Sequence, residues 1–207
     1  MSSVSGSFKP SECAKVVVGL SAQAGATTYM KHIIFEFKAR LRNEKHIRAV
    51  LKQQRAKSVG TDHQVDTYFC VPHGRLKVRE GNIENALIFC ERPDDHGARA
   101  STVQMLELPL ENPVKPILTA ALGVLTVVDK RREIYFVDNV KIHLDRVRGL
   151  GEFVEVEAIS RTSSLTKVRE QAGEFQRLFQ IASEDFVGES YSDLMLAKGA
   201  RDKQAHS

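Results

Sequence analysis

The chain has 207 residues, of which 42% are hydrophobic and 27% are charged, so it can bury a core and wholesale disorder is excluded. No run approaches the roughly 18 apolar residues of a membrane span, so we expect a soluble protein without a membrane partner. The formal charge of +4 points to an anionic partner. The three cysteines lack C-x-x-C spacing, which argues against a disulfide framework or a thiolate zinc site and favours the reducing cytoplasm.

The first 29 residues differ from the rest of the chain. They are rich in Ser, Ala, Gly and Thr and contain only three charged residues. Such a segment buries little apolar surface, so it is expected to stay mobile. We therefore predict a flexible arm over 1–29, a folded domain over 30–198 and a disordered tail over 199–207.

Hydrophobic periodicity predicts many strands and a few helices in the domain. The strands are expected at 31–41, 66–71, 74–80, 86–92, 101–108, 125–132, 134–138, 139–147 and 152–160. Helices are expected at 43–56, where Asn43 can act as the N-cap, and at 116–123, 164–181 and 191–198. This pattern predicts an α+β domain built on a large antiparallel sheet or barrel.

Charged and apolar side chains alternate along these strands. Residues two apart on a strand share a face, so Glu36, Lys38 and Arg40 lie opposite Phe35 and Phe37. A half-buried sheet with a solvated face explains any single strand. Ionic faces on so many strands instead favour a closed barrel with an ionic interior and helices over its apolar outside. The other candidates for the interior are Arg75, Lys77, Arg79, Arg92, Lys130, Arg132, Lys141, Asp145, Glu155 and Glu157.

An ionic interior of this kind suits a chain of phosphates and a metal ion. A barrel of about eight strands has room for one small ligand, and Arg and Lys side chains bind phosphate oxygens well. Carboxylates would repel a polyphosphate unless a divalent cation lay between them. Carboxylate and phosphate oxygens are the usual ligands of Mg²⁺ or Mn²⁺, so the pattern indicates metal-assisted chemistry on a triphosphate.

Several stretches resemble the CYTH superfamily of triphosphate tunnel enzymes, which includes class IV adenylate cyclases and thiamine triphosphatases. They are FEFKARL (35–41), DTYFCVPHGRLKVRE (66–80), LIFCERPD (87–94), VVDKRREIYF (127–136) and KIHLDRVRGLGEFVEVE (141–157). The resemblance implies a closed eight-stranded antiparallel barrel with helices packed outside, and one or two divalent ions. One departure is Ile34, which stands where the family's E-x-E-x-K signature has its first Glu.

The resemblance also implies roles for individual residues. Glu36, Glu155 and Glu157 would hold the metal, with Asp145 as a helper, and Glu36, Lys38, Glu155 and Glu157 would form the catalytic group. His143 shares the lining face but is more often structural at such a position, and Asp66 is expected in a cap or turn. The phosphate-binding residues would be Lys38, Arg75, Lys77, Arg79, Arg92, Lys130 and Arg132, with Arg40 and Lys141 as additions.

Three functions follow as alternatives. The first is a metal-dependent hydrolase that removes the terminal phosphate of an inorganic, organic or nucleoside triphosphate. The second is a class IV-type adenylate cyclase that makes cyclic AMP and pyrophosphate from ATP, and the third is a non-catalytic polyphosphate binder. Nucleic acid is disfavoured because the basic strands lack the interleaved aromatics needed for base stacking. The oligomeric state stays open, with a homodimer among the options.

Overall fold

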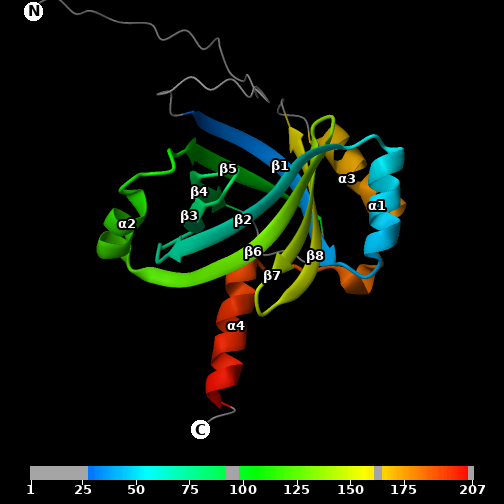
Figure 1. The fold of residues 1–207 in the computed structure, drawn as a ribbon. Helices are drawn as coiled ribbons and strands as arrows, with labels where there is room; N and C mark the ends of the chain where they lie inside the picture. The colour runs from blue at the N-terminus through cyan, green and yellow to red at the C-terminus, as the bar shows by residue number, and fades with distance from the viewer. Residues whose placement is uncertain (1–27, 92–97, 161–164, 205–207) are drawn as a thin grey trace, which may run out of the picture.

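The computed structural model describes residues 28–91, 98–160 and 165–204. Its centre is a closed barrel of eight antiparallel strands (Figure 1), arranged in the order β1-β5-β4-β3-β2-β6-β7-β8 with β8 paired to β1. This confirms the predicted fold class. The strands are β1 (Tyr29–Arg40), β2 (Lys57–Phe69), β3 (Arg75–Glu80), β4 (Ala86–Glu91), β5 (Arg99–Glu107), β6 (Val124–Val137), β7 (Val140–Val147) and β8 (Gly151–Ser160).

Helices cover the outer face of one side of the barrel. Helix α1 (Glu44–Gln53) begins at Asn43, whose side chain accepts a hydrogen bond from the backbone N–H of His46 at 3.0 Å. It lies beside α3 (Thr166–Leu178) against β1, β7 and β8 (Figure 1). The outward residues of those strands form the main core with both helices, so the apolar strand faces are buried as predicted. This core includes Phe35, Phe37, Ile47, Ile142, Leu144, Val154, Val156, Val168 and Phe175.

A second apolar cluster closes one end of the barrel. After the short helix η1 (Ser183–Asp185), the chain runs beside β1, where the Val187 N–H donates to the Lys38 carbonyl at 2.9 Å. Ser190 and Asp193 then cap α4 (Tyr191–Gln204) through reciprocal side-chain and backbone hydrogen bonds. The start of α4 is thereby fixed under the barrel. The cluster consists of Tyr68, Val128, Val147, Phe153 and Tyr191.

Several element boundaries differ from the predicted ones. Strand β2 begins at Lys57 rather than at 66 because its polar first half pairs with β6, and β6 is one continuous strand where two were predicted. Helix α4 continues past Gly199 to Gln204, since strong helix formers follow the glycine. The predicted arm lies outside the described residues as far as residue 27, and Tyr29 already belongs to β1.

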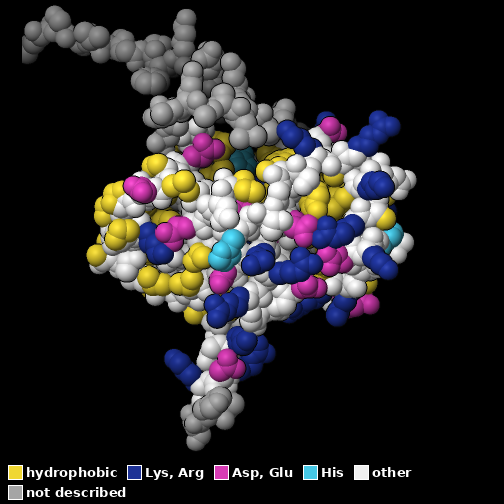
Figure 2. All heavy atoms as spheres, in the orientation of Figure 1, with side chains coloured by type: hydrophobic (Ala, Val, Ile, Leu, Met, Phe, Trp, Pro, Cys, Tyr) yellow, Lys and Arg dark blue, Asp and Glu magenta, His cyan; other side chains and the backbone are white. Residues whose placement is uncertain are grey.

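Helix α2 (Val114–Leu122) stands apart from the core. None of its residues is buried, and hydrophobic side chains gather over it and the neighbouring part of β6 in Figure 2. Among the helices that the structure describes, none is long and apolar enough to cross a membrane.

Candidate active site in the barrel interior

The barrel encloses a cavity of about 350 Å³. Strand β1 contributes Met30, His32, Ile34, Glu36 and Lys38 to its lining, all at positions two apart. The pleat of a strand sends alternate side chains to opposite faces, and the outward residues Phe35 and Phe37 pack in the core with the helices. Charged residues therefore face a space that the core does not fill.

Most of the predicted site residues border this one cavity. Arg40 and Asp145 do not line it, and Arg92 lies outside the described residues. The predicted residues that line the cavity are Glu36, Lys38, Arg75, Lys77, Arg79, Lys130, Arg132, Lys141, Glu155 and Glu157.

Arg40 and Asp145 lie toward the closed end of the barrel. Arg40 Nη1 donates to the Leu150 carbonyl at 2.9 Å, and its guanidinium lies 4.5 Å from the centre of the Phe153 ring. Asp145 is fully buried and accepts hydrogen bonds from Arg132 Nε at 2.7 Å and from the Tyr191 hydroxyl at 2.8 Å. Asp145 therefore binds Arg132 on the side away from the cavity and does not itself line the cavity.

Asp66, which the sequence assigned to a cap or turn, lies at the centre of the basic residues. Its carboxylate accepts hydrogen bonds from Lys77 Nζ at 2.8 Å, Arg79 Nε at 2.8 Å and Lys130 Nζ at 2.6 Å. Burial opposes its ionisation, but Arg79, Lys130 and Lys77 hold the pKa of this carboxyl well below its usual value. Asp66 is thus a buried anion shared by three basic side chains.

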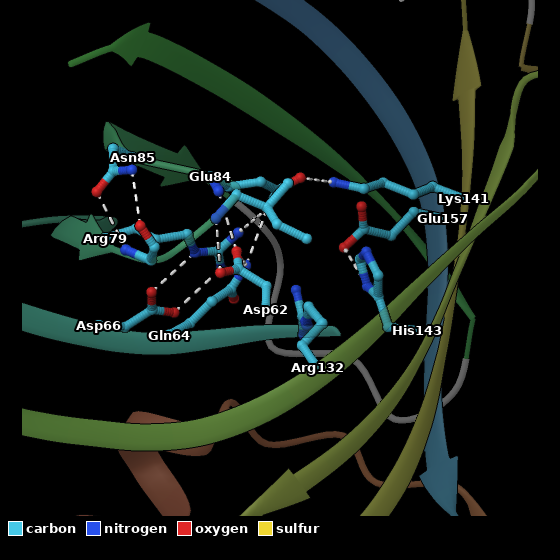
Figure 3. A network of polar contacts seen from close by, with 12 residues as sticks. Asp62, Gln64, Asp66, Arg79, Glu84, Asn85, Arg132, Lys141, His143 and Glu157 are labelled. Carbon is cyan, nitrogen blue, oxygen red and sulfur yellow. Dashed lines mark hydrogen bonds and ion pairs between the residues drawn. The ribbon is translucent and has the colours of Figure 1, made fainter. Parts of the chain in front are cut away.

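Glu84 is a second carboxylate that strand periodicity missed, because it belongs to the loop between β3 and β4. Figure 3 shows this loop folded against Asp62, whose carboxylate accepts hydrogen bonds from the backbone N–H groups of Ile83 and Glu84 at 2.9 and 3.0 Å. The loop must approach closely at Gly81, where an added Cβ would lie 2.7 Å from Asp62 Oδ2. Glu84 is thereby directed into the barrel.

The Glu84 carboxylate bridges two predicted phosphate-binding residues. Arg79 Nη1 donates to it at 2.9 Å, and Lys141 Nζ donates to its other oxygen. Glu84 therefore already occupies hydrogen-bond donors that a phosphate group would use.

These carboxylates change the charge of the cavity. Over the described residues, seven basic side chains line it against six acidic ones. The interior candidates from the sequence were nine basic residues against four acidic ones. In the structure Asp66, Glu84 and Glu107 also line the cavity, and they offset most of the excess positive charge. The acidic residues are Glu36, Asp66, Glu84, Glu107, Glu155 and Glu157.

Lys130 is the most deeply buried of the lysines in the lining. Burial lowers the pKa of its ammonium to about 7, and Arg79, Arg132 and Lys77 add to this effect while Asp66 opposes it. The side chain of Lys130 therefore changes charge near neutral pH.

Glu155 lies between two cations. Its carboxylate forms an ion pair with Lys38 Nζ at 3.2 Å and another with Arg132. Although burial works against the charge, Lys38 and Arg132 hold the pKa of Glu155 well below its usual value. Lys38 also donates to the Glu189 carbonyl at 3.1 Å, so this end of the site is tied to the start of α4.

His143, Glu155 and Glu157 form a group whose ligand atoms lie within 4.8 Å of one another. His143 Nδ1 is 3.6 Å from Glu155 Oε2. It is also 3.7 Å from Glu157 Oε1, and Figure 3 shows these two side chains next to each other. Burial, with Arg132 nearby, lowers the pKa of His143, so its ring is neutral at pH 7. Neither ring nitrogen has a hydrogen-bond partner among the residues that the structure describes. A divalent cation would supply that partner and offset both carboxylates, so these residues fit a metal ion.

Glu36 adjoins this group. Its Cα is the register partner of Glu157, and its Oε1 accepts a hydrogen bond from the Ser101 hydroxyl at 2.7 Å. Ile34, at the position of the family's missing Glu, is buried in the lining and pairs in register with Ile159.

The model of the CYTH domain matches residues 32–191. This range begins within β1, contains the other seven strands whole and ends at the start of α4. The protein therefore belongs to the CYTH family. No curated protein matches the sequence.

Solved structures show the same fold. The PH1012 protein from Pyrococcus horikoshii OT3 is 27% identical with a TM-score of 0.66, over 78% of this chain and 98% of that one. A putative adenylate cyclase from Vibrio parahaemolyticus is 20% identical with a TM-score of 0.63, over 79% and 98%. A putative adenylyl cyclase from Hippeastrum, described as having a dominant triphosphatase activity, is 16% identical with a TM-score of 0.54, over 80% and 96%.

Proposed function

We propose that this protein is a divalent-metal-dependent hydrolase that removes the terminal phosphate of a triphosphate held in the barrel cavity. The observation that supports this is the meeting, in one enclosed space, of buried basic side chains with His143, Glu155 and Glu157. Family members described as cyclases or triphosphatases agree with a triphosphate ligand.

Glu36, Glu155, Glu157 and His143 are the residues that would hold Mg²⁺ or Mn²⁺. When bound, the ion would supply positive charge that polarises a phosphate oxygen and lowers the pKa of a water molecule. Asp145 takes a positioning role in this scheme, because its two hydrogen bonds fix the direction of Arg132 beside Glu155.

The phosphate chain would take over hydrogen bonds that now end on internal carboxylates. Lys77, Arg79 and Lys130 converge on Asp66, so their donors are already oriented toward one point. Preorganised donors lose little freedom when the anion arrives, which strengthens binding. Lys38, Arg75, Arg132 and Lys141 would contact the remaining phosphate oxygens, and Arg92 stays a further prediction.

The charge balance of the cavity supports metal dependence. Seven basic groups against six acidic ones leave little net positive charge for a triphosphate, which carries about four negative charges. The excess negative charge would be unfavourable in a low-dielectric interior. One or two divalent ions bound with the substrate would offset it.

The direct test uses purified protein with Mg²⁺ or Mn²⁺ and, separately, tripolyphosphate, thiamine triphosphate and ATP. Orthophosphate release supports the hydrolase. Cyclic AMP with pyrophosphate would identify the cyclase instead, and tight tripolyphosphate binding without turnover would identify a binder. Glu155→Gln and Glu157→Gln are expected to abolish metal-dependent turnover. Glu152→Gln is the matched control, because Glu152 lies on the same strand but is exposed outside the cavity.

A further inference from the structure

Part of the cavity lining is apolar. Met30 on β1 pairs in register with Met105 on β5, which pairs with Ile88 on β4, and Val103 lies two residues from Met105 on the same face. Ile34 on β1 pairs with Ile159 on β8. His32, which pairs in register with Val103, lies on the same face between Met30 and Ile34. We call the apolar residues of this part of the lining the apolar wall: Met30, Ile34, Ile88, Val103, Met105 and Ile159.

The apolar wall borders empty space instead of filling it. Met30, Val103, Met105 and Ile159 are only partly buried, and all six residues line the cavity. On β5 the residue that points outward between Val103 and Met105 is the polar Gln104. Apolar surface facing a hydrated cavity is unfavourable by about 25 cal/mol per Å². An apolar ligand group would remove that cost, as in small-molecule pockets lined mainly by hydrophobic residues with a few polar groups.

The apolar wall also adjoins the groups that would bind phosphate and metal. Ile88 pairs in register with Lys77, and Ile34 lies two residues before Glu36 on the same face of β1. Ile159 has the same relation to Glu157 on β8. A single ligand can therefore place phosphates on the basic residues and an attached group on the apolar wall.

We propose that the preferred substrate is a triphosphate monoester whose organic group is aliphatic or aromatic, and that inorganic triphosphate is a poorer ligand. This inference rests on the proposed function, which leaves the kind of triphosphate open. Inorganic triphosphate is polar along its whole length and gains nothing from the apolar wall. An ester gains from each apolar atom that the wall covers.

The first test compares tripolyphosphate with methyl, propyl and phenyl triphosphate as substrates in Mg²⁺. Burial of a methylene group is expected to raise kcat/KM about fourfold, so the esters should improve in that order. Equal or lower values for the esters would overturn the inference and leave the hydrolase proposal standing. If no compound is hydrolysed, the hydrolase proposal fails, and calorimetry with the same series decides the inference by affinity.

Two nearly isosteric variants test whether the preference for the esters depends on the apolar wall. Val103→Thr and Met105→Gln each add a polar group without a large change of volume. Each is expected to lower the preference for phenyl triphosphate over tripolyphosphate by roughly fivefold, and using both guards against one that fails to fold. Val127→Thr is the matched control, since Val127 is exposed on the outside of β6. An unchanged preference in two folded wall variants would overturn the assignment.

Discussion

Lys130 Nζ lies 2.6 Å from Asp66 Oδ2, and both side chains are almost completely buried. Lys77 and Arg79 bond the same carboxylate, so one buried anion is shared by three basic side chains. This cluster gives separate predictions for stability, pH dependence and binding.

Replacing Asp66 by Asn should destabilise the free protein. Lys77 and Arg79 would then repel each other without their shared anion, and Lys130 would lose the carboxylate that favours its charged form. Breaking a buried ion pair commonly costs about 3 kcal/mol. Urea unfolding of Asp66→Asn measures the loss, and saturating tripolyphosphate should restore more stability in the variant than in the wild type. Asp129→Asn is the control, because Asp129 pairs with His63 on the outer surface. Equal stability of the two variants would contradict a structural role for Asp66.

The pKa of Lys130, lowered to about 7, predicts that triphosphate binding depends on pH. Above pH 7 Lys130 is mostly neutral in the free protein, whereas a bound anion favours its charged form. Binding should therefore take up a proton, and affinity should fall by up to about tenfold per pH unit above pH 7. Calorimetry in buffers with different ionisation enthalpies measures this uptake. Lys130→Arg should bind triphosphate without proton uptake, since arginine stays charged. An unchanged uptake in that variant would show that another group takes up the proton.

Glu84 competes with phosphate for Arg79 and Lys141, to which it is bonded in the structure. Glu84→Gln should therefore bind tripolyphosphate more tightly, by roughly fivefold, since a charge-assisted hydrogen bond is worth about 1 kcal/mol or more. The comparison variant is Glu80→Gln, which alters an exposed ion pair with Lys115. Weaker binding by Glu84→Gln would instead indicate that Glu84 holds the two cations in place for the ligand.

His143 is expected to provide a nitrogen ligand to the metal. With Mn²⁺ bound, pulsed electron paramagnetic resonance should detect coupling to a ¹⁴N nucleus, and His143→Leu should remove it. The affinity for Mn²⁺ should fall by about tenfold or more in that variant. His63→Leu, at an exposed position, should change neither property. A nitrogen signal that persists in His143→Leu would exclude this ligand.

The sequence was sufficient to predict the closed barrel and the direction in which its side chains point. Strict alternation in β1 and β8 placed Glu36, Lys38, Glu155 and Glu157 on the inner face, because apolar residues between them require the helix-covered outside. Periodicity specifies the face of a strand but not the depth along the barrel. Asp145 lies on the same face of its strand as Lys141, which lines the cavity. Asp145 does not line it, because its side chain is buried against Arg132 and Tyr191. The stagger of the strands sets this position.

Glu84 could not be found in this way. Its position in the loop between β3 and β4 depends on Asp62, which lies on β2. The Asp62 carboxylate accepts hydrogen bonds from backbone N–H groups of that loop. Asp66 was missed for another reason. The predicted strand began at 66, so the residue was taken for its boundary, whereas β2 extends from Lys57 to Phe69 and places Asp66 well inside the sheet.

The alternation in β1 separates two tasks between adjacent positions of the chain. Phe35 and Phe37 belong to the core with the helices, while Glu36 and Lys38 face the cavity. Point substitutions at odd positions should therefore alter folding, and those at even positions should alter ligand chemistry. Deleting one residue near the start of β1 would turn the core-facing side chains toward the cavity and the cavity-facing side chains toward the core. Insertions and deletions in this strand should therefore be far less tolerated than substitutions.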